Sequence, residues 1–256
     1  MPHSDLIQPV DLVSRRALFV KSLTGMAGLA LGFRGLNALG LPAGGGISDL
    51  SMPTSCTLTC ASTVGPCYYD SQLIRQDITE GVTGLPMLIS FLVVNADTCQ
   101  PVSNASIDIW HADAAGVYSG PINTMCSGSD LAVRQQIFLR GIQFTDAAGW
   151  AHFNSVYPGW YSSRTTHIHL TVRVNGAEMV TTQLFFDDDF TTFVYHNFSP
   201  YTSRPNKDTT NLGDNVIGGS ASRAMPFLFD TKLIENKTLV VRKLLAIRGT
   251  KTTCAA

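Results

Sequence analysis

The stretch YPGWYSSRTTHIHL, residues 157–170, gathers residue types that bind metals or stabilise charge. It contains two histidines, His167 and His169, separated by a single isoleucine. Successive side chains of a β-strand point to opposite faces, so both imidazoles are expected on one face and Ile168 on the other. Two imidazoles on one face suit a single metal ion, although such a pair also occurs as two ordinary strand residues.

The residues just ahead of the histidines favour the metal. Tyr161 and Arg164 precede them, and burying such polar groups beside apolar strands is costly unless they find partners. A phenolate is a hard anionic oxygen ligand, and a strongly Lewis-acidic ion favours it over the phenol. Two phenolates with two neutral imidazoles would therefore suit Fe(III) better than zinc or cuprous copper. Zinc or copper held by His167 and His169 is the alternative.

The segments that must position these side chains are short and rich in β-branched and aromatic residues. The runs predicted as strands are PMLISFLVVN, SIDIWHA, WAHFNSVYP, HIHLTVRVNG, MVTTQLFFD and TLVVRKLLAIRG. Only SDLAVRQQIFLRG, near Asp130, is compatible with a helical period. The sequence therefore predicts a mainly β protein, an antiparallel β-sandwich core with short helices and long loops.

One short piece, DAAG, occurs twice, at Asp113–Gly116 and at Asp146–Gly149. An aspartate first and a glycine last suit a tight reversal in which the glycine takes a positive φ. Both pieces are predicted to be hairpin turns. Each is followed closely by an aromatic residue, Tyr118 in the first case and Trp150 in the second.

The N-terminal segment has the pattern of an export signal. Arg15-Arg16 precede an apolar, glycine-rich stretch that is too short to span a bilayer comfortably, which needs about 20 apolar residues. We expect a twin-arginine-type signal peptide over residues 1–43, a linker over 44–59 and one catalytic domain over 60–256. An uncleaved amphipathic helix or anchor is the alternative. The mature chain is expected to be periplasmic or extracellular, without a stable membrane span.

Composition limits the partners. The chain has 256 residues and a formal net charge of -1, so no broad basic field is available to bind nucleic acid. Its six cysteines, in a chain expected in an oxidising compartment, favour structural disulfides over a zinc site. Their pairing is left open. A homo-oligomer is left open as well.

Several ordered motifs resemble those of the intradiol ring-cleavage dioxygenases, non-haem ferric enzymes that include catechol and protocatechuate dioxygenases. The resemblance covers most of the chain from about residue 60 to residue 200. The motifs are GPCYYD, IRQDITEG, CQPVSNASIDIWHADAAGVYSG, FLRGIQFTDAAGWAHFNSVYPGWYSSRTTHIHL and TTQLFFDDD. The later VYHNFSPYTSR also fits the family pattern.

The resemblance implies a site residue by residue. The four iron ligands would be Tyr118, Tyr161, His167 and His169, and the pocket would be lined by Arg164 and Gln183. A small aromatic diol would bind Fe(III), with Tyr161 displaced to accept a proton and Arg164 offsetting negative charge. Oxygen, the second substrate, would then cleave the ring between the two hydroxylated carbons to give a muconate-type diacid.

Other residues received a less specific interpretation. Tyr157 is the alternative to Tyr161 as a ligand, but Tyr161 follows the Pro-Gly as the family pattern requires. His111, His152 and His196 are placed outside the metal site, and Asp187-Asp188-Asp189 is interpreted as a solvated turn. The rival to an enzyme is an exported β-sandwich binding module that keeps the motif without catalysis.

Overall fold

The computed structural model describes residues 55–235 and 237–249. The predicted signal peptide and most of the predicted linker lie outside these residues, so the export signal and the boundaries at 43 and 59 stay predictions.

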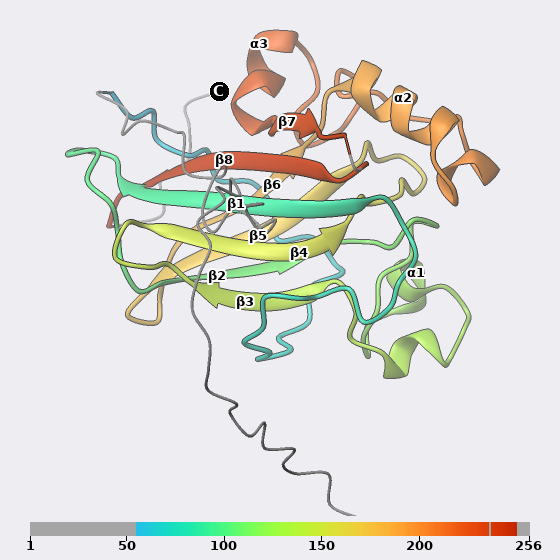
Figure 1. Cartoon of the computed structure of the whole chain (residues 1–256), viewed down its shortest axis with the longest axis horizontal. Coiled ribbons are helices and arrows are strands. Elements are labelled where there is room, and N and C mark those ends of the chain that lie inside the picture. Colours follow the sequence, from blue (N-terminus) through green and yellow to red (C-terminus); the bar gives the residue numbers. More distant parts are fainter. Residues whose placement is uncertain (1–54, 236, 250–256) are drawn as a thin grey trace, which may run out of the picture. The chain divides into compact units, whose positions relative to one another are not determined.

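Two four-stranded sheets pack face to face in the described part of the chain (Figure 1), which confirms the mainly β sandwich. The first sheet has the order β4-β1-β8-β7, with β1 Pro86–Asn95, β4 Trp150–Val156, β7 Asp230–Leu233 and β8 Leu239–Ile247. The second has the order β3-β2-β5-β6, with β2 Ala105–Trp110, β3 Arg140–Phe144, β5 His167–Val174 and β6 Ala177–Phe185.

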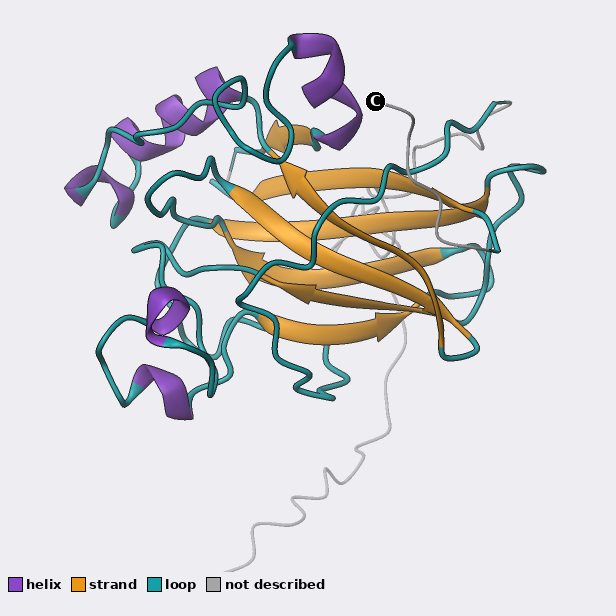
Figure 2. Ribbon diagram, turned by 180° about the vertical axis from the view of Figure 1, so that it is seen from behind, coloured by secondary structure: helices purple, strands orange, loops and turns teal. Residues whose placement is uncertain are grey.

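Helices are short and lie in the connections, as Figure 2 shows from behind. The α-helices are α1 Thr124–Ser127, α2 Asp188–Asn197 and α3 Ala221–Ala224, and the 3₁₀ turns are η1 Val133–Gln135, η2 Tyr201–Ser203 and η3 Met225–Phe227. Both views place α1 and α2 at the same end of the sandwich. None of the described helices is long and apolar enough to cross a membrane.

The core follows from strand alternation. Ile89 and Phe91 of β1 and Ile168 and Leu170 of β5 are fully buried in one cluster between the two sheets. The residues of β1 on the opposite face are also buried, because Leu92 packs with residues of β8 and with the segment around residue 56. Burial on both faces explains why β1 is almost continuously apolar.

One strand pair departs from the antiparallel arrangement that the sequence predicts. β1 and β8 pair in parallel, from Met87 opposite Leu239 to Asn95 opposite Ile247. Antiparallel neighbours can be joined by a tight hairpin, whereas parallel neighbours need a long connection. Nearly the whole domain lies between these two strands, so no short turn fixes their relative direction. The sheet that contains them is therefore mixed.

Two predictions about helices and turns also need correction. The stretch near Asp130 forms only the 3₁₀ turn η1. The aspartates at 187–189 are not a solvated turn, because Asp187 caps the N-terminus of α2 by accepting from the backbone N–H groups of Asp189 and Phe190. Asp188 forms an ion pair with Lys207. Acidic residues stabilise a helix N-terminus, since its N–H groups lack partners within the helix.

Both DAAG pieces are tight turns, but neither is the predicted hairpin, because the first leads from β2 into a loop and the second connects β3 to β4, which belong to different sheets. In each, the aspartate carboxylate accepts two backbone N–H groups, from Ala115 and Val117 in the first turn and from Ala148 and Trp150 in the second. The closing glycines have φ of 84° and 81°. The first turn leads directly to Tyr118.

Candidate metal centre

The strand β5 carries the two histidines on the face that points away from the sandwich core. His167 is 3% exposed and His169 is 1% exposed, because a chain segment near residues 62–67 covers this face. The backbone N–H of Ser62 donates to Thr181 of β6, and Gly65 packs on the imidazole of His169. The prediction that both histidines lie on one face of the strand is confirmed, since Ile168 points into the core.

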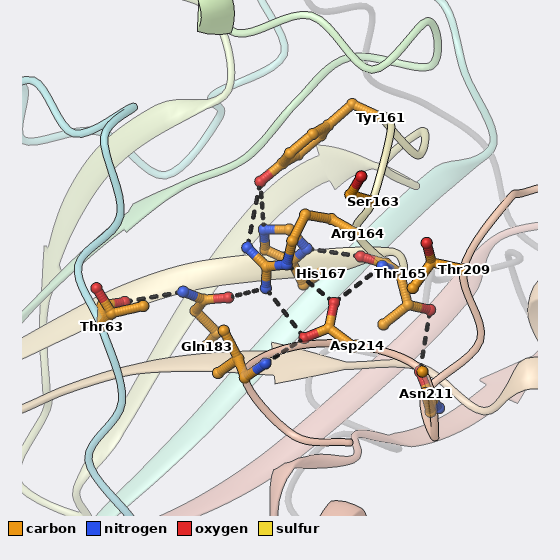
Figure 3. Close-up of polar contacts among 12 residues, drawn as sticks. Thr63, Tyr161, Ser163, Arg164, Thr165, His167, Gln183, Thr209, Asn211 and Asp214 are labelled. Carbon is orange, nitrogen blue, oxygen red and sulfur yellow. Dashed lines mark hydrogen bonds and ion pairs between the residues drawn. The ribbon is translucent and has the colours of Figure 1, made fainter. Parts of the chain in front are cut away.

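Two tyrosine side chains meet these histidines. The phenol oxygen of Tyr161 lies 3.0 Å from Nε2 of His167, and that of Tyr118 lies 3.4 Å from the same nitrogen. Nε2 of His169 is also 3.0 Å from Nε2 of His167. All four donor atoms therefore converge at one point, and Figure 3 shows Tyr161 directed at His167.

The hydrogen bonds around His167 fix which of its nitrogens carries a lone pair. Nδ1 of His167 lies 2.7 Å from the carbonyl oxygen of Thr165, which can only accept. Nδ1 is therefore protonated, and Nε2 turns its lone pair toward the two phenols. A hydrogen bond from the other ring nitrogen to a carbonyl oxygen is the usual arrangement for a metal-binding histidine. The ring of His169 is held differently, by stacking on Trp110 at 5.0 Å between ring centroids.

The donor set fits a metal ion. Separations of 3.0 to 3.4 Å between Nε2 of His167 and the other three donor atoms place all four within reach of a single metal ion. Burial lowers the pKa of His167 to about 3, and that of His169 well below its usual value, so both imidazoles are neutral, the form that binds a metal. Within the described residues, no three His, Cys, Asp or Glu side chains are grouped to bind a metal. The phenols therefore distinguish this centre from a carboxylate or thiolate site.

The two phenols are not equivalent. Tyr118 is 1% exposed and packs with Trp110 and the Cys67–Cys126 disulfide, whereas Tyr161 is only partly buried and lines a cavity. Burial raises the pKa of Tyr118 well above its usual value. Burial also raises the pKa of Tyr161, although the nearby Arg164 opposes the shift. Both phenols line the same cavity, and Tyr161 is the more exposed of the two.

Two glycines allow the loops that carry these tyrosines to touch. Gly159, two residues before Tyr161, donates its N–H to the carbonyl of Asp113 at 2.8 Å. A Cβ at Gly159 would lie 2.3 Å from the carbonyl oxygen of Ala114, and a Cβ at Gly116 would lie 2.1 Å from that of Trp160. Glycine is required at both positions because the two backbones are in direct contact.

Replacing Gly159 with alanine should therefore separate the two tyrosines. The added methyl group meets backbone rather than a flexible side chain, so we expect a loss of about 1–3 kcal/mol in folding stability. Bound metal should fall with it. Thermal unfolding and the ratio of metal to protein measure both effects. Gly249→Ala is the matched control, because a Cβ there meets nothing within 4 Å. Equal metal content in the two variants would contradict this account.

Arg164 lies beside the donor atoms and is held from two sides (Figure 3). Its Nε donates to the carboxylate of Asp214 at 2.9 Å, and its Nη2 donates to Oε1 of Gln183. The amide nitrogen of Gln183 donates in turn to the carbonyl of Thr63 at 2.8 Å. Gln183 is fully buried with both amide atoms occupied, so it positions the guanidinium from behind.

Asp214 is the functional residue that the sequence did not reveal. Its side chain has no solvent exposure, and it also accepts the backbone N–H groups of Thr165 and Val216. Burial alone would raise the pKa of this carboxyl, but the hydrogen bond and charge of Arg164 together with these N–H groups lower it below the usual value. No pattern in the irregular loop around Asp214 links it to Arg164, which precedes it by 50 residues.

A cavity of about 460 Å³ opens over the donor atoms. Its walls include Tyr118, Tyr161 and Arg164 from the predicted site, together with the Cys67–Cys126 disulfide. A second disulfide joins Cys56 to Cys99, and no described cysteine is free. The prediction of structural disulfides is confirmed. The Cys67–Cys126 disulfide joins the segment that covers His169 to the loop before η1. In that loop, the carbonyl of Cys126 accepts the N–H of Tyr118 at 2.9 Å.

The remaining candidates lie elsewhere. Tyr157 is fully buried among Phe186, Tyr195 and Tyr201, with its hydroxyl bonded to Thr191. The two histidines outside the core also have local partners, since His152 stacks on Trp150 and His196 bonds to its own helix. His111 is buried, with its imidazole between the carbonyl of Ala112 and the hydroxyl of Ser155.

His111 should make folding stability depend on pH. Burial lowers the pKa of His111 from 6.5 to about 4. The unfolded chain therefore takes up a proton near pH 6.5 that the folded protein rejects until about pH 4. The contribution of His111 to folding stability is complete above pH 6.5. It is lost as the pH falls to 4, which lowers the free energy of unfolding by about 3 kcal/mol.

Urea unfolding between pH 4 and pH 7 measures this dependence. His111→Gln should flatten the profile relative to the wild type, whereas His196→Gln, at an exposed position of α2, should leave it unchanged. An unchanged slope in His111→Gln would show that another group sets the pH dependence.

Comparison with known proteins agrees with the geometry. A family model described as Dioxygenase matches residues 63–203. The fold is similar to that of the intradiol ring-cleavage dioxygenase from Tetranychus urticae, at a TM-score of 0.67 and 26% identity over 77% of this chain and 98% of that one.

More distant structures share the fold. The 3-chlorocatechol 1,2-dioxygenase from Rhodococcus opacus 1CP matches at a TM-score of 0.51 and 20% identity, over 73% of this chain and 71% of that one. Hydroxyquinol 1,2-dioxygenase from Pseudomonas putida DLL-E4 matches at a TM-score of 0.51 and 17% identity, over 75% of this chain and 67% of that one. None of the curated protein sequences compared matches the chain.

The family match spans more than half of the chain. The protein therefore belongs to the dioxygenase family, as an enzyme of the intradiol ring-cleavage class. The matched residues 63–203 include most of the motifs noted in the sequence. The alternative of a binding module without catalysis is therefore set aside.

Proposed function

We propose that the protein is a ferric dioxygenase that cleaves a catechol-type ring between its two hydroxylated carbons. The observation that carries the proposal is the convergence of both phenol oxygens and Nε2 of His169 on Nε2 of His167. When bound, Fe(III) would supply Lewis acidity, because a diol that chelates it through both oxygens has its electron density shifted in favour of reaction with O2. Tyr118, Tyr161, His167 and His169 would hold it.

The reaction balances without a further reductant. One O2 is consumed for each diol, and the bond between the two hydroxylated carbons breaks. Each of these carbons keeps its own oxygen and gains one atom from O2, so that two carboxyl groups form. The four oxidising equivalents of O2 are used by the diol itself.

The residues around the ligands have separate roles in this proposal. Tyr161 is partly exposed in the cavity, which suits a phenol that would accept a proton from the diol. Arg164 lies 3.5 Å from that phenol oxygen and is held by Asp214, so its positive charge faces the developing negative charge without first having to move. Tyr118, His167 and His169 are buried and stay fixed.

Purified protein tests the proposal directly. Iron content and the visible spectrum come first, because tyrosinate bound to Fe(III) gives a red-brown colour. Oxygen uptake with catechol, hydroxyquinol and protocatechuate then identifies the diol, with an expected ratio of one O2 for each diol consumed. A colourless protein that contains zinc or copper, and consumes no oxygen with any of these diols, would contradict the proposal.

We also propose that the enzyme works outside the cytoplasm. Two disulfides in the described residues, Cys56–Cys99 and Cys67–Cys126, suit an oxidising compartment. Cell fractionation tests this location: replacement of Arg15 and Arg16 by lysine should retain the protein in the cytoplasm, and normal export of that variant would argue against a twin-arginine signal.

A further inference from the structure

The cavity over the metal centre continues into a second hollow of about 730 Å³. Thr63, Asn215 and Val216 line both, so the two spaces meet at these residues. The second hollow, here called the side groove, extends from this junction to α3 and the turn that follows it, where Ser220, Ser222, Arg223, Pro226 and Phe227 form its wall.

The junction is fixed next to the catalytic groups. The carbonyl of Thr63 accepts the amide of Gln183, whose other amide atom accepts from Arg164 (Figure 3). Val216, which also lines the junction, donates its N–H to Asp214, the carboxylate that holds the same guanidinium. A substituent that extends from the bound ring into the side groove therefore passes Thr63 and Val216. Both residues are hydrogen-bonded to side chains that hold Arg164.

The volume exceeds what a simple diol needs. Sites for ligands of drug size occupy about 300–1,000 Å³, so the 460 Å³ cavity alone already exceeds the needs of one six-membered ring. The side groove adds space on the side of the cavity formed by Thr63, Asn215 and Val216, and this space extends toward α3. Its shape suits a ring with one long substituent better than a ring with several short ones.

The side groove also has a definite chemistry. Ala61, Val216, Pro226 and Phe227 supply apolar surface, and Ser62, Ser220 and Ser222 supply hydroxyl groups. Arg223 is the charged residue of its lining, and among the described residues no carboxylate forms an ion pair with it. An anionic group at the far end of the substituent would find its counter-charge there.

We propose that the natural substrates are catechols that carry an extended side chain with a terminal carboxylate, bound with the ring at the metal and the side chain in the side groove. This inference rests on the proposed function and names the substrate class of the same site. Arg223 recognises the carboxylate, and the junction at Thr63 and Val216 selects for a single long substituent.

Steady-state kinetics of the iron-loaded enzyme test the proposal. The substrates are dihydroxyphenylpropanoate and dihydroxyphenylpentanoate, compared with catechol and with uncharged alkylcatechols of the same chain lengths. We expect kcat/KM to be highest for one of the carboxylates. Arg223→Gln should lower kcat/KM for the carboxylates by about fivefold to tenfold and leave catechol and the alkylcatechols unchanged. Ser222→Trp, which fills the side groove, should lower kcat/KM for every long substrate and spare catechol.

Two further measurements separate the possible failures. Lys232→Gln removes an exposed positive charge from β7, outside the lining of the side groove, and should change nothing. Dissociation constants measured without oxygen should show the same selective effect of Arg223→Gln without any turnover. If catechol is cleaved but the carboxylates show no advantage, or if Arg223→Gln weakens all diols equally, the side groove is not the binding site. If no diol is bound or cleaved, the proposed function itself fails.

Discussion

Replacing His167 and His169 together with alanine should remove bound iron and abolish ring cleavage. Both imidazoles are buried and neutral, and Nε2 of His167 is the point on which the other three donor atoms converge. The double variant leaves only the two phenols. Since a Lewis-acidic metal contributes several kcal/mol to transition-state stabilisation, we expect activity to fall by more than about a thousandfold.

The readouts are the ratio of iron to protein, the visible charge-transfer band and oxygen uptake. The double variant His152→Ala, His196→Ala is the matched control, because it removes the same number of imidazoles from positions outside the centre. It should keep iron, colour and activity. A His167→Ala, His169→Ala protein that retained both iron and activity would show that the metal centre has been assigned wrongly.

Arg164→Met should separate metal binding from catalysis. None of the four converging donor atoms belongs to Arg164, so the variant should keep iron and colour. It should lose roughly 10²–10³ in kcat, the size typical for removing one group that stabilises charge in the transition state. The substitution also leaves the buried carboxylate of Asp214 without its cation, which costs about 3–5 kcal/mol of folding stability when one partner of a buried pair is removed.

A double-mutant cycle distinguishes these two effects. Asp214→Asn should lower kcat with iron retained, because the guanidinium loses the partner that orients it. The variant Arg164→Met, Asp214→Asn should be more stable than the sum of the single losses predicts, by about 1–3 kcal/mol, without recovering turnover. Strictly additive losses in stability would mean that the two side chains do not interact in solution. Normal turnover by Asp214→Asn would remove Asp214 from the catalytic account.

Local patterns predicted those parts of the fold and site that depend on neighbouring residues. Strand alternation placed His167 and His169 on one face, and the aspartate and glycine of each DAAG piece specified a turn. Tyr118 could be joined to this group only by resemblance to a family. No local rule states that the turn before it contacts the backbone at Gly159.

The features that escaped prediction depend on contacts between distant segments. The pairing of β1 with β8, the cover that Gly65 provides over His169, and the bond from Arg164 to Asp214 each join residues far apart in the chain. Asp187 was misjudged for a related reason. An aspartate run is equally compatible with a solvated turn and with a helix cap, and the choice depends on the weakly apolar helix that follows.

The parallel pairing of β1 with β8 has a consequence for biosynthesis. All four strands of the sheet that carries the histidines are translated before β8, whereas β1 must wait for the last strand before both of its edges are paired. During translation β1 therefore presents an unpaired apolar edge, which is the kind of surface that aggregates or recruits chaperones. The half of the domain that carries the two histidines can form early, and the half that contains β1 and β8 closes last.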